Sequence, residues 1–394
     1  MGNRKPHILV ECLELIPSVR VGVLDPLQPQ NGILYDVQFV KTIDIRKHHL
    51  VWADIFVTVR GSDRTTLRIV REAKRLGRMV VYYLDDDLLN LPRDSMDYKW
   101  FMENKQDRYM RKILALSDCL WGVNTKIKEK YLPLCGTERW IQNRVPMKIA
   151  VLSQSAADEK PVKILYAGSS GHEKMVREIL SPAVRKICRK RGDAVQFTFV
   201  GVDPGLKDCS QVQVHSFFEN YDEYHRFVEA GNFSIGLAVV RMDDFYQCKY
   251  YNKFVEYSGI GVVGVYTDCD LYRQIIEHGK NGLLCANTTQ GWVTAIERLV
   301  DDAQLRRNCI QQAQDLLFRE FQPKDVCESM IAQLPELAAY NAPQCEIKQV
   351  RLPSPELIHI VDVMGYLFRK YFILAVFVIA FKAIRRLFKL NRKV

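Results

Sequence analysis

The 394-residue sequence contains no internal repeat, no low-complexity tract and no C-x-x-C pair. Its eleven cysteines are scattered, and several lie within apolar runs, where a buried thiol behaves as a small hydrophobe. The lack of a disulfide framework or a cysteine metal motif argues against a small secreted fold and indicates a reducing cytosol. The first residues are a poor signal peptide, because Glu11 interrupts their short apolar run, and MGNRKP is a weak acylation signal.

The charge of the chain is concentrated at one end. Of the formal net charge of +10, eight Lys or Arg residues lie between 369 and 394 with no acid among them, which leaves the rest close to neutral. A basic face for nucleic acid would need this charge on the folded body, so we expect no nucleic-acid partner. With 48% hydrophobic and 26% charged residues, the chain is typical of a soluble globular protein, and its length indicates two domains of ordinary size or three.

Strand and helix signals alternate along most of the chain. In the first half, apolar runs at 7–13, 54–60, 78–87 and 119–124 alternate with helical patterns at 64–77, 105–118 and 125–132. A second series begins at 162, after the polar linker 153–161. Such alternation predicts parallel sheets covered by helices. We therefore predict an α/β fold with two Rossmann-like doubly wound domains, at 1–152 and 162–345, which face a cleft where ligands bind.

The stretch YYNKFVEYSGIG in the second domain predicts a helix that ends near Gly259. Lys253 and Glu256 are three residues apart and share a face of this helix, and Lys249 precedes them. A cation suits a phosphate and a carboxylate suits ribose hydroxyls, so the pattern indicates a nucleoside diphosphate site. The alternative is an exposed ion pair with no function.

The run from Phe245 to Gly282 and the strands and loops across 162–325 resemble the donor-binding half of GT-B glycosyltransferases. The similarity is to the family-4-like group (glycosyltransferase group 1) that builds bacterial surface polysaccharides, and VVYYLDDDLLNLP resembles a segment of the same proteins. The resemblance implies a nucleotide-sugar donor, with Glu256 on the ribose and Lys253 and Lys249 facing the diphosphate.

Further roles follow from the resemblance alone. Gly168 and Ser169 would offer backbone amides to phosphate, and His172 matches a His of the related loop. Ser216 and Phe217 would lie near the base. Two features depart from the family: Cys248 stands where many retaining members carry a second Glu, and GSSGH replaces a basic glycine-rich loop.

Three aspartates, Asp85–Asp87, end a predicted strand of the first domain. Asp85 and Asp86 are candidate catalytic residues, as a general base facing the acceptor hydroxyl. A metal site for Mg²⁺ or Mn²⁺ and simple helix capping are the alternatives. We expect no metal and no cofactor, since the nucleotide-sugar is a substrate.

The C-terminal segment 357–394 contains eleven consecutive apolar residues at 371–381, flanked by basic residues. A bilayer-spanning helix needs about 20 residues, so we predict a monotopic, membrane-associated helix anchored at an anionic membrane surface. A buried terminal helix and a true span over 357–381 are the alternatives.

Together these features predict a metal-independent hexosyl- or deoxyhexosyltransferase at the cytoplasmic face of the inner membrane, peripheral or monotopic. It would transfer a sugar from a nucleotide-sugar to a lipid-linked glycan or polysaccharide acceptor in lipopolysaccharide or capsule synthesis. The alternatives are an inactive, membrane-attached GT-B-fold binding protein, favoured by Cys248, and a metal-dependent transferase that uses Asp85–Asp87.

Overall fold

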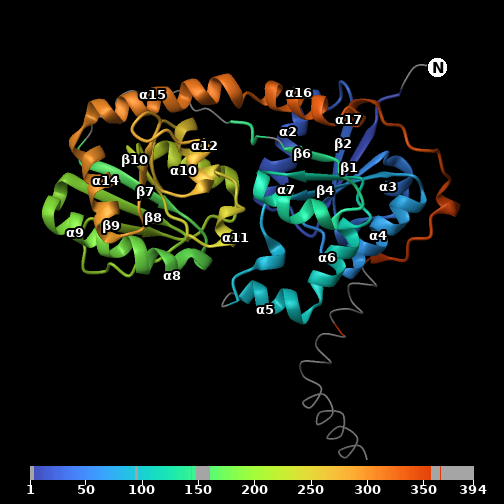
Figure 1. Ribbon diagram of the computed structural model, residues 1–394, viewed down its shortest axis with the longest axis horizontal. Coiled ribbons are helices and arrows are strands. Elements are labelled where there is room, and N and C mark those ends of the chain that lie inside the picture. The colour runs from blue at the N-terminus through green and yellow to red at the C-terminus, as the bar shows by residue number, and fades with distance from the viewer. Residues whose placement is uncertain (1–3, 94–95, 143, 148–159, 356–363, 365–394) are drawn as a thin grey trace, which may run out of the picture.

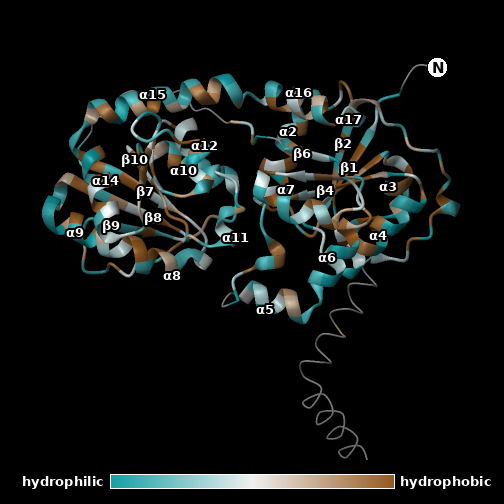
Figure 2. Cartoon of the chain, viewed as in Figure 1, coloured by the Kyte–Doolittle hydropathy of each residue, from teal (hydrophilic) through white to brown (hydrophobic). Residues whose placement is uncertain are grey.

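Two α/β domains lie next to each other in the computed structural model, and the long helix α15 (Ala303–Glu320) runs along one side of the second domain towards the first (Figure 1). The structure describes all residues except 1–3, 94–95, 143, 148–159, 356–363 and 365–394. Each domain has a parallel sheet between helices. Figure 2 shows the hydrophobic strands enclosed by helices whose outer sides are hydrophilic, as expected for sheets buried on both faces.

The sheet of the first domain is wholly parallel, with strand order β2-β1-β3-β4-β5-β6. Its strands are β1 (His7–Cys12), β2 (Asp36–Lys41), β3 (Ile55–Val59), β4 (Met79–Leu84), β5 (Cys119–Gly122) and β6 (Trp140–Gln142). The sequence patterns predict the four central strands but not β2 and β6, which are the two edges. The order reverses between β1 and β3, so a crevice opens there at the carboxyl ends of the strands.

The second sheet is also wholly parallel, with the order β12-β11-β10-β7-β8-β9. Its strands are β7 (Val162–Ala167), β8 (Val195–Val200), β9 (Val212–His215), β10 (Ile235–Ala238), β11 (Val263–Thr267) and β12 (Leu283–Cys285). Numbered within the domain and read from β9, this is the dinucleotide-binding order 3-2-1-4-5-6. Its switch point lies between β7 and β10, and the loops that follow these two strands carry the predicted site residues.

Several of the covering helices begin at a residue whose side chain caps them. Asp63 accepts a hydrogen bond from the Thr66 amide at the start of α4, and Asn124 accepts one from Ile127 at the start of α7. The main helices of the two domains are α4 (Arg64–Arg75), α6 (Gln106–Leu114), α7 (Thr125–Tyr131), α9 (Ser181–Arg191), α10 (Tyr221–Ala230), α12 (Asn252–Gly259) and α14 (Thr289–Asp301). The predicted alternation of strand and helix, and with it the two-domain α/β fold, is confirmed.

The chain returns to the first domain after α15. Helices α16 (Pro323–Gln333) and α17 (Glu336–Ala339) and the segment beyond them pack on this domain. The Tyr35 hydroxyl lies 3.1 Å from the Cys327 sulfur, Tyr340 donates to the Gly77 carbonyl at 2.7 Å, and Asp54 accepts from the Ala342 amide at 2.8 Å. The sequence analysis assigns residues up to 345 to the second domain, whereas those from Pro323 onward lie on the first.

The predicted anchoring tail and nearly all of the predicted linker lie outside the described residues. Within the part of the chain that the structure does describe, no helix combines the length and the apolar character needed to cross a bilayer.

Candidate functional site

A cavity of about 240 Å³ lies between the two domains at the carboxyl ends of their strands. The first domain contributes Ser18 and Asp25, from the helical segment 17–27, and Asp85, which follows β4. The second domain contributes Tyr221 from α10 and both Lys253 and Glu256 from α12. The Lys–Glu pair predicted from the sequence therefore faces an interdomain cavity and not bulk solvent.

Lys253 and Glu256 form a close pair. The Lys253 ammonium donates to both carboxylate oxygens of Glu256 at 3.0 Å, and the side chains are 26% and 13% exposed. The Tyr224 hydroxyl donates a further hydrogen bond to Glu256. The ammonium also lies 5.6 Å from the Tyr224 ring centroid and 5.5 Å from that of Tyr257. The two tyrosines thus surround a positive and a negative group that lie side by side in the cavity wall.

The buried face of α12, next to the face of this pair, explains why the pair points into the cavity. Phe254 and Tyr257 are fully buried, and the Tyr257 hydroxyl donates to the Leu237 carbonyl of β10 at 2.9 Å. The Tyr257 ring packs on Gly236, where a Cβ would lie 2.5 Å from the ring. Because the buried face is fixed on the sheet, the polar residues of α12 are directed towards the other domain.

A chain of ion pairs joins the two domains beside the cavity. Lys249 donates to Asp86 of the first domain at 2.7 Å, and Arg60 donates to the second oxygen of Asp86 at 2.7 Å and to Asp85 at 2.6 Å. Burial alone would raise the pKa of Asp86, but Lys249 and Arg60 lower it below its usual value. Asp86 is therefore ionised near neutral pH and holds a lysine predicted to face the diphosphate.

Asp87 differs from its two neighbours because its side chain is fully buried. It accepts hydrogen bonds from Lys130 at 2.6 Å, from the Tyr131 hydroxyl at 2.6 Å and from Asn90 at 2.9 Å. Each of the three aspartates thus has a protein cation within hydrogen-bond distance. No group of three His, Cys, Asp or Glu among the described residues is arranged to hold a metal.

The loop after β7 lies close to both lysines. Burial, together with Lys249 and Lys253, lowers the pKa of His172 to about 4, so its ring is neutral near pH 7. Its Nδ1 lies 3.2 Å from the Tyr166 hydroxyl. The Gly168 amide donates to the Val200 carbonyl at 3.0 Å. The phosphate-binding roles predicted for Gly168 and Ser169 stay predictions.

Ser216 and Phe217 follow β9 and are both exposed. Gly201 has a φ of +73°, and a Cβ there would lie 2.2 Å from the Gly168 carbonyl and 3.0 Å from the Phe217 ring. Phe217 therefore lies beside the loop that leaves β7, at the same edge of the sheet, although it does not line the cavity. Contact of these two residues with a base stays a prediction.

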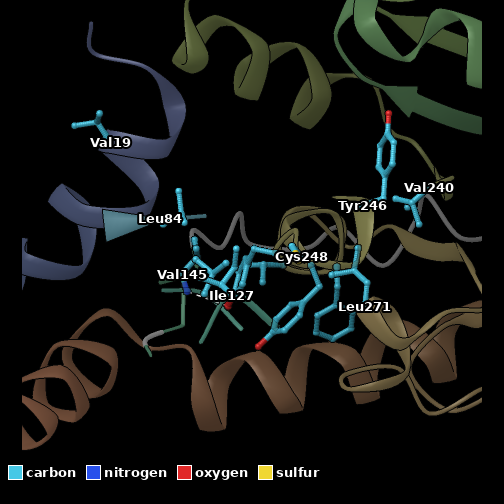
Figure 3. Packing of buried hydrophobic residues seen from close by; sticks show 14 of the residues in the cluster. Val19, Leu84, Ile127, Val145, Val240, Tyr246, Cys248 and Leu271 are labelled. Carbon is cyan, nitrogen blue, oxygen red and sulfur yellow. Dashed lines mark hydrogen bonds between the residues drawn. The ribbon is translucent and has the colours of Figure 1, made fainter. Parts of the chain in front are cut away.

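Cys248, at the position of the family's second Glu, does not line the cavity. It is fully buried at the domain junction, where Figure 3 draws it with Ile127 and Val145 of the first domain. Its thiol lies 3.7 Å from an oxygen of Asp87, and its backbone carbonyl accepts from the Asn124 amide at 2.6 Å. Burial raises the pKa of this thiol to about 11, so Cys248 acts here as a packing residue.

Several site residues are absent from the sequence analysis. Arg60 directly follows β3 and has a φ of +55°. Tyr224 comes from α10, which precedes the Lys–Glu helix by a whole strand. Arg20 of the first domain pairs with Asp222 of the second at 3.0 Å. The sequence gives weak signals for Arg60, as the basic end of DIFVTVR, and for Tyr224, in the aromatic run YDEYH. Only the three-dimensional structure reveals the partners of these two residues.

Two facing Rossmann-like domains with the ligand-binding groups in the cleft between them define the GT-B class of glycosyltransferase folds. Residues 161–302, which lie in the second domain, match the model of the family described as glycosyl transferases group 1. This match confirms the resemblance of the second domain to that group, while the bacterial surface polysaccharide type stays a prediction. The search of curated proteins gives no match.

Solved structures agree with this assignment of the fold. The chain is similar to HepE from Anabaena, crystallised with UDP and glucose, at 13% identity and a TM-score of 0.62, over 84% of this chain and 100% of that one. It is also similar to the sucrose-phosphate synthase of Thermosynechococcus elongatus, at 12% identity and a TM-score of 0.60, over 85% and 99%. A glycosyltransferase from Rickettsia africae gives 10% identity and a TM-score of 0.56, over 85% and 98%.

Proposed function

We propose that this protein is a glycosyltransferase that moves a sugar from a nucleotide-sugar to a lipid-linked or polysaccharide acceptor in bacterial surface glycan synthesis. The observation that carries the proposal is the Lys253–Glu256 pair in the wall of a cavity that both domains share. Structures of the similar HepE contain UDP, glucose and UDP-glucose, which supports a nucleotide-sugar as the donor here.

In the proposed complex, Glu256 accepts hydrogen bonds from the ribose hydroxyls, and Lys253 stabilises the diphosphate. Lys249 exchanges its bond to Asp86 for one to the phosphate as the negative charge of the leaving group develops. Asp85, which lines the cavity from the first domain, then accepts the proton of the acceptor hydroxyl. This chemistry uses cations of the chain itself, which favours a metal-independent reaction.

The cytoplasmic face of the inner membrane is the proposed location, because the basic apolar tail suits a monotopic anchor and the acceptor is confined to the bilayer. A second candidate function is a membrane-attached binding protein that holds a nucleotide-sugar without transferring it. The observation in its favour is Cys248, which cannot supply the carboxylate that many relatives place near the donor sugar.

The test begins with a thermal-shift screen of the purified chain against UDP-, GDP- and dTDP-sugars. The nucleotide found is then titrated by calorimetry into wild type, Lys253→Ala and Glu256→Ala. We expect each variant to weaken binding at least ten-fold, with Lys128→Ala, an exposed lysine of α7, as the unchanged control. Unchanged affinity in both site variants would refute the site. Binding without hydrolysis or transfer of the sugar would favour the second candidate.

A further inference from the structure

The Tyr224 hydroxyl has a different kind of partner from the hydroxyls of three other tyrosines of the chain. Tyr82, Tyr257 and Tyr340 donate to backbone carbonyl oxygens, at 2.8, 2.9 and 2.7 Å, and so satisfy polar groups of the fold itself. Tyr224 donates instead to the carboxylate of Glu256, which lies in the wall of the interdomain cavity. Tyr224 is thus bonded to the group that is proposed to bind the ribose.

The two oxygens of the Glu256 carboxylate are not equivalent. Oε1 accepts hydrogen bonds from both the Tyr224 hydroxyl and the Lys253 ammonium, the latter at 3.0 Å. Within the part of the chain that the structure describes, Oε2 accepts only from Lys253, also at 3.0 Å. Because each carboxylate oxygen can accept two hydrogen bonds, Oε1 is fully used and Oε2 is left with room for a hydroxyl of a ligand.

The contact with Tyr224 gains importance when a nucleotide-sugar binds. In the proposed complex the Lys253 ammonium is shared with the diphosphate, which weakens its hold on Glu256. The Tyr224 hydroxyl stays available, because burial and the charge of Glu256 raise the pKa of Tyr224 well above its usual value and the hydroxyl keeps its proton. Tyr224 is then the donor that fixes the orientation of the Glu256 carboxylate.

The start of α10 holds Tyr224 in place. Asn220 caps this helix by accepting hydrogen bonds from two amides of its first turn, at 2.8 and 3.3 Å. Asp222 of the same turn pairs with Arg20 of the first domain at 3.0 Å, and the centroid of the Tyr224 ring lies 6.1 Å from that of Phe218. The hydroxyl is therefore held beside Glu256 by contacts that do not involve α12.

We infer that Tyr224 is a positioning residue for the donor: its hydroxyl holds one oxygen of Glu256 and leaves the other directed at a hydroxyl of the nucleotide's sugar ring. Tyr224 does not line the cavity, so it acts on the ligand through Glu256. The inference rests on the proposed function, in which Glu256 binds the ribose. It predicts that binding depends on Tyr224 only when the nucleotide carries a hydroxyl on its sugar ring.

The experiment measures by calorimetry how the full chain binds UDP, GDP and dTDP, each beside its 2′,3′-dideoxy form, which lacks those hydroxyls. Tyr224→Phe keeps the aromatic ring, whose centroid lies 5.6 Å from the Lys253 ammonium, and removes only the hydroxyl. We expect this variant to bind the hydroxyl-bearing nucleotide about ten-fold more weakly, as the loss of a hydrogen bond to a charged group would require, and to bind the dideoxy form within about two-fold of wild type. The double variant Y224F/E256A should bind no more weakly than E256A, because both changes act on one contact.

The matched control is Tyr340→Phe, which removes a tyrosine hydroxyl that donates to a backbone carbonyl and does not line the cavity. Its affinity for both forms of the nucleotide should equal that of wild type, and melting temperatures show that each variant is folded. Equal losses for the two forms in Tyr224→Phe would indicate a purely structural role and overturn the inference. Additive losses in the double variant, or a wild type that binds both forms equally, would do the same.

The results also separate this inference from the proposed function. If Glu256→Ala weakens binding and Tyr224→Phe does not, the role of Tyr224 is refuted and the donor site stands. If the wild type binds none of the nucleotides, both are refuted.

Discussion

Replacing Asp86 with Asn should tighten binding of the donor nucleotide, because Asp86 and the diphosphate compete for Lys249. The Asp86 carboxylate lies 2.7 Å from the Lys249 ammonium, and the two side chains are 15% and 25% exposed. At an effective dielectric of about 20, two unit charges 4 Å apart interact by about 4 kcal/mol. Partial exposure weakens this attraction, and the phosphate must be desolvated to contact Lys249 just as Asp86 is. The nucleotide should therefore bind D86N more favourably than wild type by about 1–2 kcal/mol. Affinity should therefore rise by about 5–30-fold.

The assay is calorimetric titration of the nucleoside diphosphate found in the donor screen. Lys249→Ala should weaken binding about ten-fold, and the double variant D86N/K249A should lose most of the gain seen in D86N, since the two residues act through one contact. Transfer by D86N falls if the carboxylate also takes part in the chemistry, so binding and turnover are measured on the same preparations. An affinity of D86N equal to or below wild type, with the circular dichroism spectrum unchanged, would refute the reasoning.

Three further outcomes are expected. Cys248→Glu should lower the melting temperature by several degrees, because it buries a second carboxylate beside Asp87, whereas Cys248→Ser should change it little; a fully stable Glu variant would contradict the packing role. Burial raises the pKa of Glu11 to about 7, so between pH 4.5 and 7 the folded chain holds a proton that the unfolded chain has lost, and its stability falls over this range. Glu11→Gln removes this loss. The free energy of unfolding of the variant relative to wild type, from urea titrations, should therefore rise by about 2.5 kcal/mol from pH 5 to pH 8, and a pH-independent difference would contradict the burial argument. Transfer should persist in EDTA, since protein cations surround Asp85–Asp87, and a loss restored by Mg²⁺ or Mn²⁺ would return the metal-dependent alternative.

The sequence contains enough information for the sheets but not for their edges. Central strands such as β3 and β4 are buried on both faces and read as continuous apolar runs, so they are predicted correctly. Strand β2 is only half-buried and β6 has three residues, so the hydrophobic pattern of neither strand can be distinguished from that of a loop. The return of α16 to the first domain depends on contacts such as Tyr35 with Cys327, which are nearly 300 residues apart and leave no local signal.

The site shows the same division between local and distant information. Lys253 and Glu256 are predictable because both lie on one face of one helix. The link between Lys249 and Asp86 joins two domains, and spacing within either segment cannot predict it. Asp87 resembles its neighbours in the sequence but is held in the core by Lys130 and Tyr131, so three identical residues have three different environments.

Because α16 and α17 return to the first domain, the C-terminal segment of the chain continues from the first domain and not from the second. Everything beyond residue 355 is tethered to the first domain, while the second is joined to it by two chain passages, near 148–159 and near Phe321. In the proposed function, any change in the width of the cleft would turn the domain that carries Lys253 and Glu256 about these two passages. An acceptor bound to the first domain would then stay in place while the nucleotide is exchanged.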